Sequence, residues 1–212
     1  MQKNCSMERR FPKLEGGVLQ QTNRENGRLK RFSDYQDEFE YLISAGIVLN
    51  VSAISTPVFP LTQAVGKNLL KLYLNDVGLL TEVLYGSNIR AVMDDETGIN
   101  LGAVYESVVA QELAAHGCKL FYYDNRNKGE VDYLIDDYDS LSAVPIEVKS
   151  GKDYTVHSAL TAFVKNEDYH VKKAYVLSNT REITTSGKIT YLPIYDVMFL
   201  GEGSVPRAQK KQ

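Results

Sequence analysis

Hydrophobic residues change their spacing several times along the chain, and each change predicts a different element. In residues 34–51, DYQDEFEYLISAGIVLNV, the residues Phe39, Leu42 and Ile43 recur at helical spacing before the chain reaches Gly46. The run VLNVSAI follows, and prolines shortly after it end the strand that this run predicts. We therefore expect a helix, a glycine stop, a strand and a loop in this region.

Two further stretches predict helices that end at glycine. In KNLLKLYLNDVGLLTEVLYG, the alternation in LLKLYL predicts a strand, and the rest predicts a short helix that ends at Gly86. In GINLGAVYESVVAQELAAHG, apolar residues recur at spacings of three and four until Gly117. This second stretch predicts an apolar helix.

The following residues predict a set of strands. CKLFYYD and EVDYLID are strand-like runs joined by the turn-rich NRNKG, which predicts a hairpin, and AVPIEVK predicts a third strand. YTVHSALTAFVK, residues 154–165, predicts a helix, KKAYVLSN a fourth strand, and KITYLPIYDVMFL a late strand or strand pair. The order helix, three strands, helix, strand predicts an α/β fold with a central mixed sheet flanked by helices.

Composition narrows the class of protein. The chain has 212 residues, of which 43% are hydrophobic, so it can bury a core as one large domain or two small ones. Its apolar runs are shorter than the roughly 20 residues of a membrane helix, and its first residues do not form a secretory signal. Cys5 and Cys118 lie too far apart in sequence to suggest a metal pair, so we expect a reduced, cytoplasmic setting and no membrane partner.

Charge is distributed unevenly around a net charge of -3. Residues 1–31 carry eight Lys or Arg and three Glu, which gives +5 and leaves -8 for the rest of the chain. A basic arm on an acidic body could contact a phosphate backbone, whereas short basic termini are more often solvated tails. The sequence favours the tail slightly.

Three residues on two neighbouring predicted strands suggest a metal site. Glu147 and Lys149 in PIEVKSG are two apart on a strand, so their side chains share a face. Asp132 in GEVDYLID lies on the preceding strand, across a hairpin. Carboxylates from adjacent strands can hold Mg²⁺ or Mn²⁺, and the carbonyl of Val148 could add a ligand.

A fourth acidic residue lies on the apolar helix. Glu106 shares a face with Val109 and Leu113, and burying a carboxylate there is costly without a cation or a hydrogen-bond donor. We therefore predict that Glu106 joins the site as a metal ligand or catalytic group. Glu130 is open to two interpretations, a further ligand or a charge at the rim, and the rim is narrowly favoured.

This set of residues suits phosphodiester hydrolysis. A metal on Asp132 and Glu147 would polarise the phosphate and a bound water, and Lys149 could orient or deprotonate that water and stabilise the transition state. Taken separately, EVDYLID and IEVKSG are ordinary strands with surface charges; their order after an acid-bearing helix favours the catalytic interpretation. The three histidines show no metal-ligand spacing, and the tyrosines on the strands are expected to fill or edge the sheet.

The segments GAVYESVVAQEL, EVDYLID and PIEVKSG, with the upstream KNLLKLYLNDVGLL, closely resemble the C-terminal domain of unknown function of prokaryotic AAA-type P-loop ATPases. That resemblance covers roughly residues 28–198. It implies a PD-(D/E)xK restriction-endonuclease-like fold, with Asp132, Glu147, Lys149 and Glu106 as the nuclease-type residues.

The resemblance also implies an organisation and partners. A basic arm and partial winged-helix-like segment would occupy residues 1–62, the nuclease-like domain 63–200 and a tail 201–212. The chain has no GxxxxGK[ST] motif, so the implied ATPase would be a partner module or protein. DNA is the expected substrate; the alternative is a non-catalytic module that binds nucleic acid or the ATPase. The oligomeric state stays open.

Overall fold

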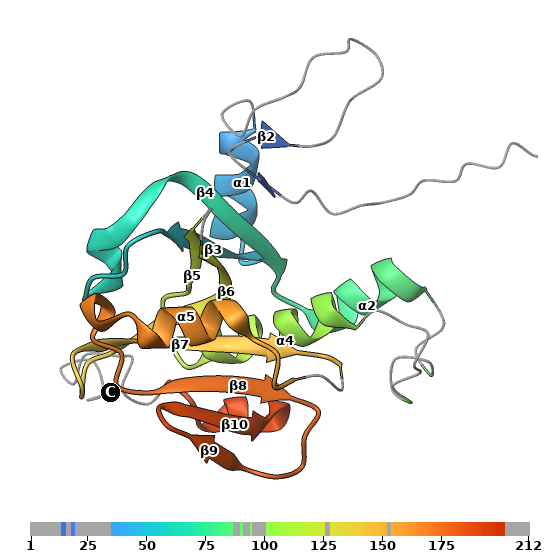
Figure 1. Ribbon diagram of the computed structural model, residues 1–212. Coiled ribbons are helices and arrows are strands. Elements are labelled where there is room, and N and C mark those ends of the chain that lie inside the picture. The colour runs from blue at the N-terminus through green and yellow to red at the C-terminus, as the bar shows by residue number, and fades with distance from the viewer. Residues whose placement is uncertain are drawn as a thin grey trace, which may run out of the picture.

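The protein is described from a computed structural model in which residues 14–15, 18–19, 35–86, 90, 94, 101–125, 128–151 and 154–201 are placed (Figure 1). Apart from the two-residue strands β1 (Leu14–Glu15) and β2 (Val18–Leu19), the predicted basic arm lies outside the described residues. The same holds for Cys5 and for most of the predicted tail. No helix in the described part of the chain is long and apolar enough to cross a membrane.

One mixed sheet organises the fold. Its strands are β3 (Val48–Ile54), β4 (Val65–Leu74), β5 (Phe121–Asn125), β6 (Gly129–Asp137), β7 (Ser142–Lys149), β8 (Ala174–Ser178), β9 (Thr184–Ser186) and β10 (Ile189–Pro193). They lie side by side in the order β4-β3-β5-β6-β7-β8-β10-β9. The pairs β3–β5, β7–β8 and β8–β10 are parallel and the others antiparallel, which confirms the predicted α/β class with a mixed sheet.

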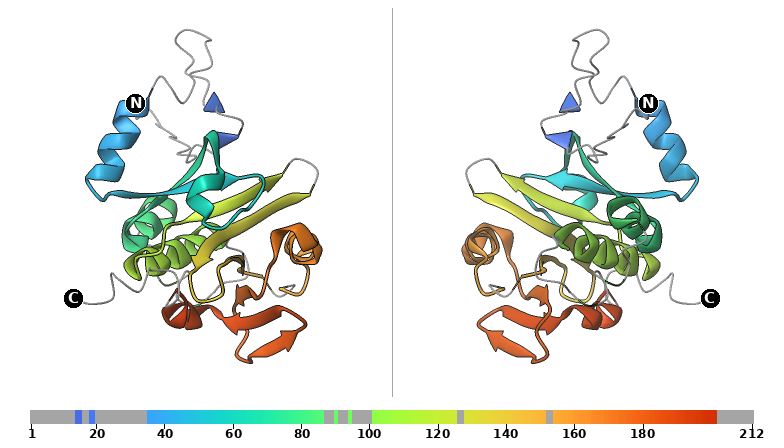
Figure 2. Two further views of the ribbon diagram at one scale, coloured as in Figure 1. Left: turned by 90° about the vertical axis from the view of Figure 1, so that its left-hand side faces the viewer. Right: turned by 90° about the vertical axis from the view of Figure 1, so that its right-hand side faces the viewer.

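Helices cover both faces of the sheet. They are α1 (Gln36–Ser44), α2 (Val77–Tyr85), α4 (Gly102–Ala115) and α5 (Ser158–Lys165), with short 3-10 helices η2 (Leu61–Ala64), η3 (Glu167–Tyr169) and η4 (Ile194–Phe199). Figure 2 shows α4 and α5 on opposite sides of the central strands. The central strands β6 and β7 are therefore buried on both faces, as their apolar residues require, whereas the edge strand β9 is exposed.

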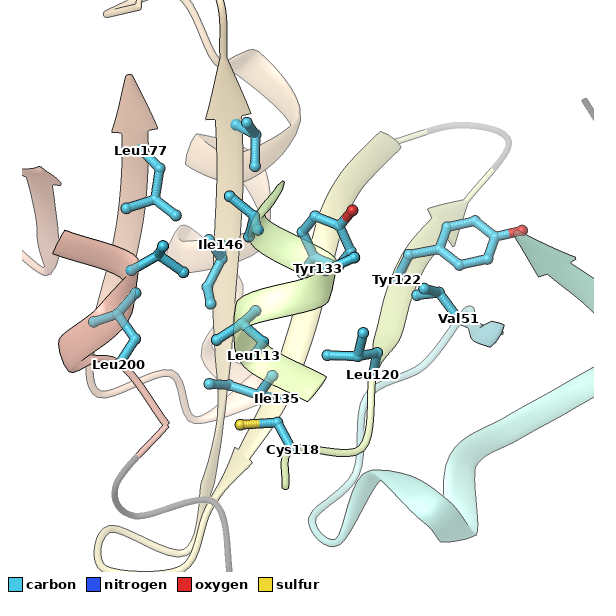
Figure 3. Packing of buried hydrophobic residues seen from close by; sticks show 14 of the residues in the cluster. Val51, Leu113, Cys118, Leu120, Tyr122, Tyr133, Ile135, Ile146, Leu177 and Leu200 are labelled. Atoms are coloured by element: carbon cyan, nitrogen blue, oxygen red, sulfur yellow. The ribbon is translucent and has the colours of Figure 1, made fainter. Parts of the chain in front are cut away.

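Two hydrophobic cores result, one on each face of the sheet. On the α4 face, Leu113 is fully buried among Tyr133, Ile135 and Ile146 of β6 and β7 (Figure 3). On the α5 face, Phe163 packs in a second cluster with side chains of β5, β6 and β8. Burial of such side chains stabilises each by about 1.5–3 kcal/mol relative to exposure.

The predicted element order is confirmed, and glycine ends the helices as expected. Gly46, Gly86 and Gly117 have φ values of 68°, 59° and 80°, a region that glycine enters without a Cβ clash. Asp76 begins α2 by accepting a 3.0 Å hydrogen bond from the Leu79 N–H.

The structure bears on the late strand predicted near the C-terminus but leaves the winged-helix-like segment near the N-terminus as a prediction. The late strand or strand pair predicted for KITYLPIYDVMFL is confirmed as one strand, β10, and the second half of the segment forms η4 directly after Pro193. Proline lacks the N–H that a continuing strand would donate to a neighbour, so the ladder stops there. Upstream, β3 pairs with both β4 and β5 in the main sheet. The winged-helix-like assignment of residues 1–62 stays a prediction.

Candidate active site

The predicted residues meet where β6 and β7 separate. The backbone pairing of these strands runs from Asp137 opposite Ser142 to Tyr133 opposite Ile146. Beyond that point the Val148 N–H donates a 2.8 Å hydrogen bond to Oδ2 of Asp132. A side-chain carboxylate thus satisfies a backbone donor at the end of the ladder and is held in place by it.

A β-bulge directs Asp132 to this position. Phe121 of β5 pairs with Leu134 and Tyr123 pairs with Val131, so a single residue of β5 faces both Asp132 and Tyr133. Val131 and Leu134 both pack in the α5-side core, although three residues apart, while Tyr133 packs in the α4-side core. The extra residue therefore breaks the alternation at Asp132, as bulges beside functional sites often do.

Glu147 and Lys149 form an ion pair at the end of β7. The Lys149 Nζ lies 2.7 Å from Oε1 of Glu147, whose residue is only 6% exposed. Its other oxygen, Oε2, is the buried side-chain polar atom that has no hydrogen-bond partner among the described residues. A buried, unsatisfied carboxylate oxygen is energetically costly and is a candidate ligand atom for a cation.

The surroundings of Asp132 change its proton affinity. Burial, followed by the negative charges of Glu147 and Glu106, raises the pKa of Asp132 to about 8. The hydrogen bond from Val148 and the charge of Lys71 oppose this rise. A carboxyl group kept largely protonated at neutral pH by burial and by acidic neighbours is typical of functional sites.

The pKa of Lys149 is also raised, which for a lysine favours the charged form. Burial alone would lower the pKa of its ammonium group, but the hydrogen bond and charge of Glu147, with the charges of Asp132 and Glu106, raise it above the usual lysine value. Lys149 is therefore a cation at neutral pH, not a free base.

Two tyrosines hold Glu106. The Tyr73 hydroxyl donates a 2.8 Å hydrogen bond to Oε2 of Glu106, and the Tyr133 hydroxyl donates a 2.9 Å bond to the Glu106 carbonyl. The two rings pack with centroids 5.8 Å apart. The predicted helix acid is thus fixed through both its side chain and its backbone.

The sequence did not identify Lys71 and Tyr73, which β4 adds to the site. Lys71 forms an ion pair with Glu130 of β6, and its Nζ lies 4.7 Å from the centroid of the Tyr122 ring. The alternation LKLYL contains a signal, because it puts Lys71 and Tyr73 on one face of a strand. Their contacts with residues of α4 and β6 form only when the chain folds, and the alternation does not predict them.

The remaining candidates lie outside the carboxylate group. Glu130 is exposed and paired with Lys71, a placement at the rim. His157 is buried and hydrogen-bonded to Tyr191 and Thr161, while His116 and His170 lie at the ends of α4 and η3.

A divalent cation suits some features of this site. Within the described residues, no three His, Cys, Asp or Glu side chains are grouped as a ready metal-binding set. The unpartnered oxygen of Glu147 and the mutual repulsion of the carboxylates are nevertheless features that a cation would relieve. Asp132 and Glu147 are the residues that would hold Mg²⁺ or Mn²⁺, with Glu106 as a further ligand.

Comparison with known proteins gives one family. Residues 101–197 match the family model described as a domain of unknown function, DUF4143. The DUF4143 match includes Glu106, Asp132, Glu147 and Lys149, whereas Lys71 and Tyr73 lie before it. Neither the comparison with curated proteins nor that with solved structures gave a match.

Proposed function

We propose that this protein is a metal-dependent nuclease of the PD-(D/E)xK type that cleaves DNA phosphodiesters. The observation that carries the proposal is the meeting of Asp132, Glu147 and Lys149 where β6 and β7 separate, with Glu106 interacting from α4. Two acids from adjacent strands and a lysine two residues after the second acid form the chemical set that metal-assisted hydrolysis needs.

Each residue has a defined task in this proposal. Asp132 and Glu147 hold the metal, and the Val148 N–H fixes the Asp132 carboxylate by a 2.8 Å bond before a metal arrives. Bound Mg²⁺ supplies a polarised phosphate oxygen and a water of lowered pKa. Glu106 completes the ligand set or accepts a hydrogen bond from a metal-bound water.

Lys149 is assigned to charge stabilisation. Because its pKa is raised by Glu147, it keeps its proton at neutral pH and cannot serve as the base that removes a proton from water. Its ammonium can instead donate to the phosphate oxygens as negative charge develops on them.

A nuclease assay tests the proposal. The full chain would be incubated with Mg²⁺ or Mn²⁺ and single-stranded, double-stranded and nicked DNA, beside Asp132→Ala and Lys149→Ala. Asp168→Ala and Lys172→Ala are matched controls, since both side chains are exposed and remote in sequence from the cluster. We expect cleavage by the wild type and controls and a loss of at least about 100-fold in the two site variants. Equal activity in all five proteins, or none in the wild type, would refute it.

An ATPase is the proposed partner. The chain lacks a GxxxxGK[ST] motif, so ATP-driven work at this site would need a separate P-loop module of the AAA type. The family resemblance of KNLLKLYLNDVGLL supports this assignment. Co-purification with such an ATPase, tested against Lys149→Ala, would show whether association is independent of the catalytic residues.

A non-catalytic binding module is the second candidate. The charge of -8 outside residues 1–31 favours the form of this module that binds the ATPase, because tight duplex binders usually carry a basic stripe. Calorimetry separates the two: a binding module retains affinity for DNA or for the ATPase and takes up no Mn²⁺.

A further inference from the structure

The edge strand β4 acts on the candidate site although it lies outside the matched segment. In the sheet order, β3 and β5 separate β4 from β6. Lys71 and Tyr73 of β4 nevertheless reach Glu130 and Tyr133 of β6. The two β4 residues share a strand face, and each acts on one site carboxylate: Lys71 lowers the pKa of Asp132, and Tyr73 binds Glu106.

Tyr73 has a hydroxyl group where packing alone would favour phenylalanine. Its residue is 9% exposed and belongs to the α4-side core. A buried hydroxyl without a partner destabilises a protein, and this one is satisfied by Oε2 of Glu106 at 2.8 Å. Burial and the charge of Glu106 raise the pKa of Tyr73, so it remains a hydrogen-bond donor at any physiological pH.

We propose that Tyr73 is a positioning residue that holds the Glu106 carboxylate toward the metal and substrate site. This inference rests on the proposed nuclease function. The hydroxyl of Tyr73 binds one carboxylate oxygen of Glu106 and restricts rotation of that side chain, while Tyr133 binds the Glu106 carbonyl and holds the backbone that carries it. With Oε2 engaged by Tyr73, Oε1 is the oxygen left to face a metal or its water. Groups that orient metal ligands in this way typically contribute 10- to 100-fold to metal affinity.

The test is a double-mutant cycle with Tyr73→Phe and Glu106→Gln in the full chain. Tyr73→Phe keeps the ring and removes only the hydroxyl. Tyr123→Phe is the matched control: its ring is also buried, and its hydroxyl hydrogen-bonds the Tyr169 hydroxyl in the core on the other face. Calorimetric Mn²⁺ binding is measured for all variants, together with kcat and KM on DNA.

Positioning predicts a specific pattern. Tyr73→Phe weakens Mn²⁺ binding by about 10- to 100-fold and lowers kcat with little change in KM, whereas Tyr123→Phe does neither. In the double variant the loss equals that of Glu106→Gln alone, because Tyr73 acts through Glu106. A purely structural tyrosine would instead lower stability to a similar degree in Tyr73→Phe and Tyr123→Phe and leave Mn²⁺ affinity unchanged.

The outcomes distinguish failure of the Tyr73 positioning role from failure of the nuclease proposal. Wild-type binding of Mn²⁺ with undiminished binding by folded Tyr73→Phe overturns the role of Tyr73 and leaves the nuclease proposal standing. Additive losses in the double variant also overturn it. Failure of the wild type to bind Mn²⁺ overturns both.

Discussion

Replacing Asp132 with Asn should stabilise the metal-free protein, and increasingly so as pH rises. Asparagine keeps the oxygen that accepts the hydrogen bond from the Val148 N–H but removes the charge that Glu147 and Glu106 repel. The folded-state pKa of about 8 lies above the usual Asp value, so the folded protein binds more protons than the unfolded chain between these values. Stability from this group is fully present below about pH 4 and is lost as pH rises to about 8.

The size of the effect follows from the two pKa values. The difference between 3.8 and about 8 corresponds to about 6 kcal/mol at pH 9, which is the ceiling. Water and rearranged side chains screen part of the repulsion, so we expect Asp132→Asn to gain about 1–3 kcal/mol at pH 9 and less than about 1 kcal/mol at pH 5. For a chain of this length, that gain raises Tm by about 2–12 °C.

Urea unfolding in EDTA at pH 5, 7 and 9 measures this effect. Asp137→Asn supplies a control of opposite sign from the same strand. Burial raises the pKa of Asp137, but hydrogen bonds from Ser140 and Lys173 and the charge of Lys173 lower it by more. The pKa of Asp137 is therefore below the usual Asp value. That carboxylate stabilises the fold above about pH 4, and its loss should destabilise at pH 7. If Asp132→Asn is no more stable than wild type at pH 9, burial and the neighbouring carboxylates do not raise the pKa of Asp132, and the electrostatic account is wrong.

Three other predictions address the metal, the second lysine and the core. Mn²⁺ affinity should rise with pH up to about 8 and then level, since Asp132 must lose its proton to bind the metal. Calorimetry in two buffers should detect the released proton. An affinity that does not change with pH would contradict the prediction. Lys71→Met should raise the pKa of Asp132 and shift the same Mn²⁺ profile to higher pH, whereas an unmoved profile would exclude Lys71 from the site's electrostatics. Leu113→Ala should cost about 2–5 kcal/mol in urea unfolding because Leu113 is fully buried, and a cost below about 1 kcal/mol would contradict the described packing.

The sequence predicted the elements well where local chemistry determines them. Glycines at 46, 86 and 117 end helices because few other residues adopt positive φ readily, and that requirement is local. The i, i+2 pair Glu147 and Lys149 follows from strand geometry, and the structure does place them in contact at 2.7 Å.

The features that the sequence did not predict depend on tertiary contacts. EVDYLID has the composition of an ordinary strand, and its sequence alone does not locate the bulge that two residues of β6 make opposite one of β5. Tyr73 looks like any strand tyrosine until α4 packs over the sheet and brings Glu106 within 2.8 Å of its hydroxyl. The apolar run after Pro193 suggested more strand, yet no neighbour pairs with it and it forms η4.

Anomalous diffraction from crystals soaked with Mn²⁺ at about pH 8.5 tests the central claim most directly. At that pH Asp132 is largely ionised, so its carboxylate is available as a ligand. The account predicts one strong Mn²⁺ peak at coordination distance from oxygens of both Asp132 and Glu147, including Oε2 of Glu147. A soaked crystal with no peak between these two carboxylates, while Mn²⁺ appears elsewhere or not at all, would contradict the account.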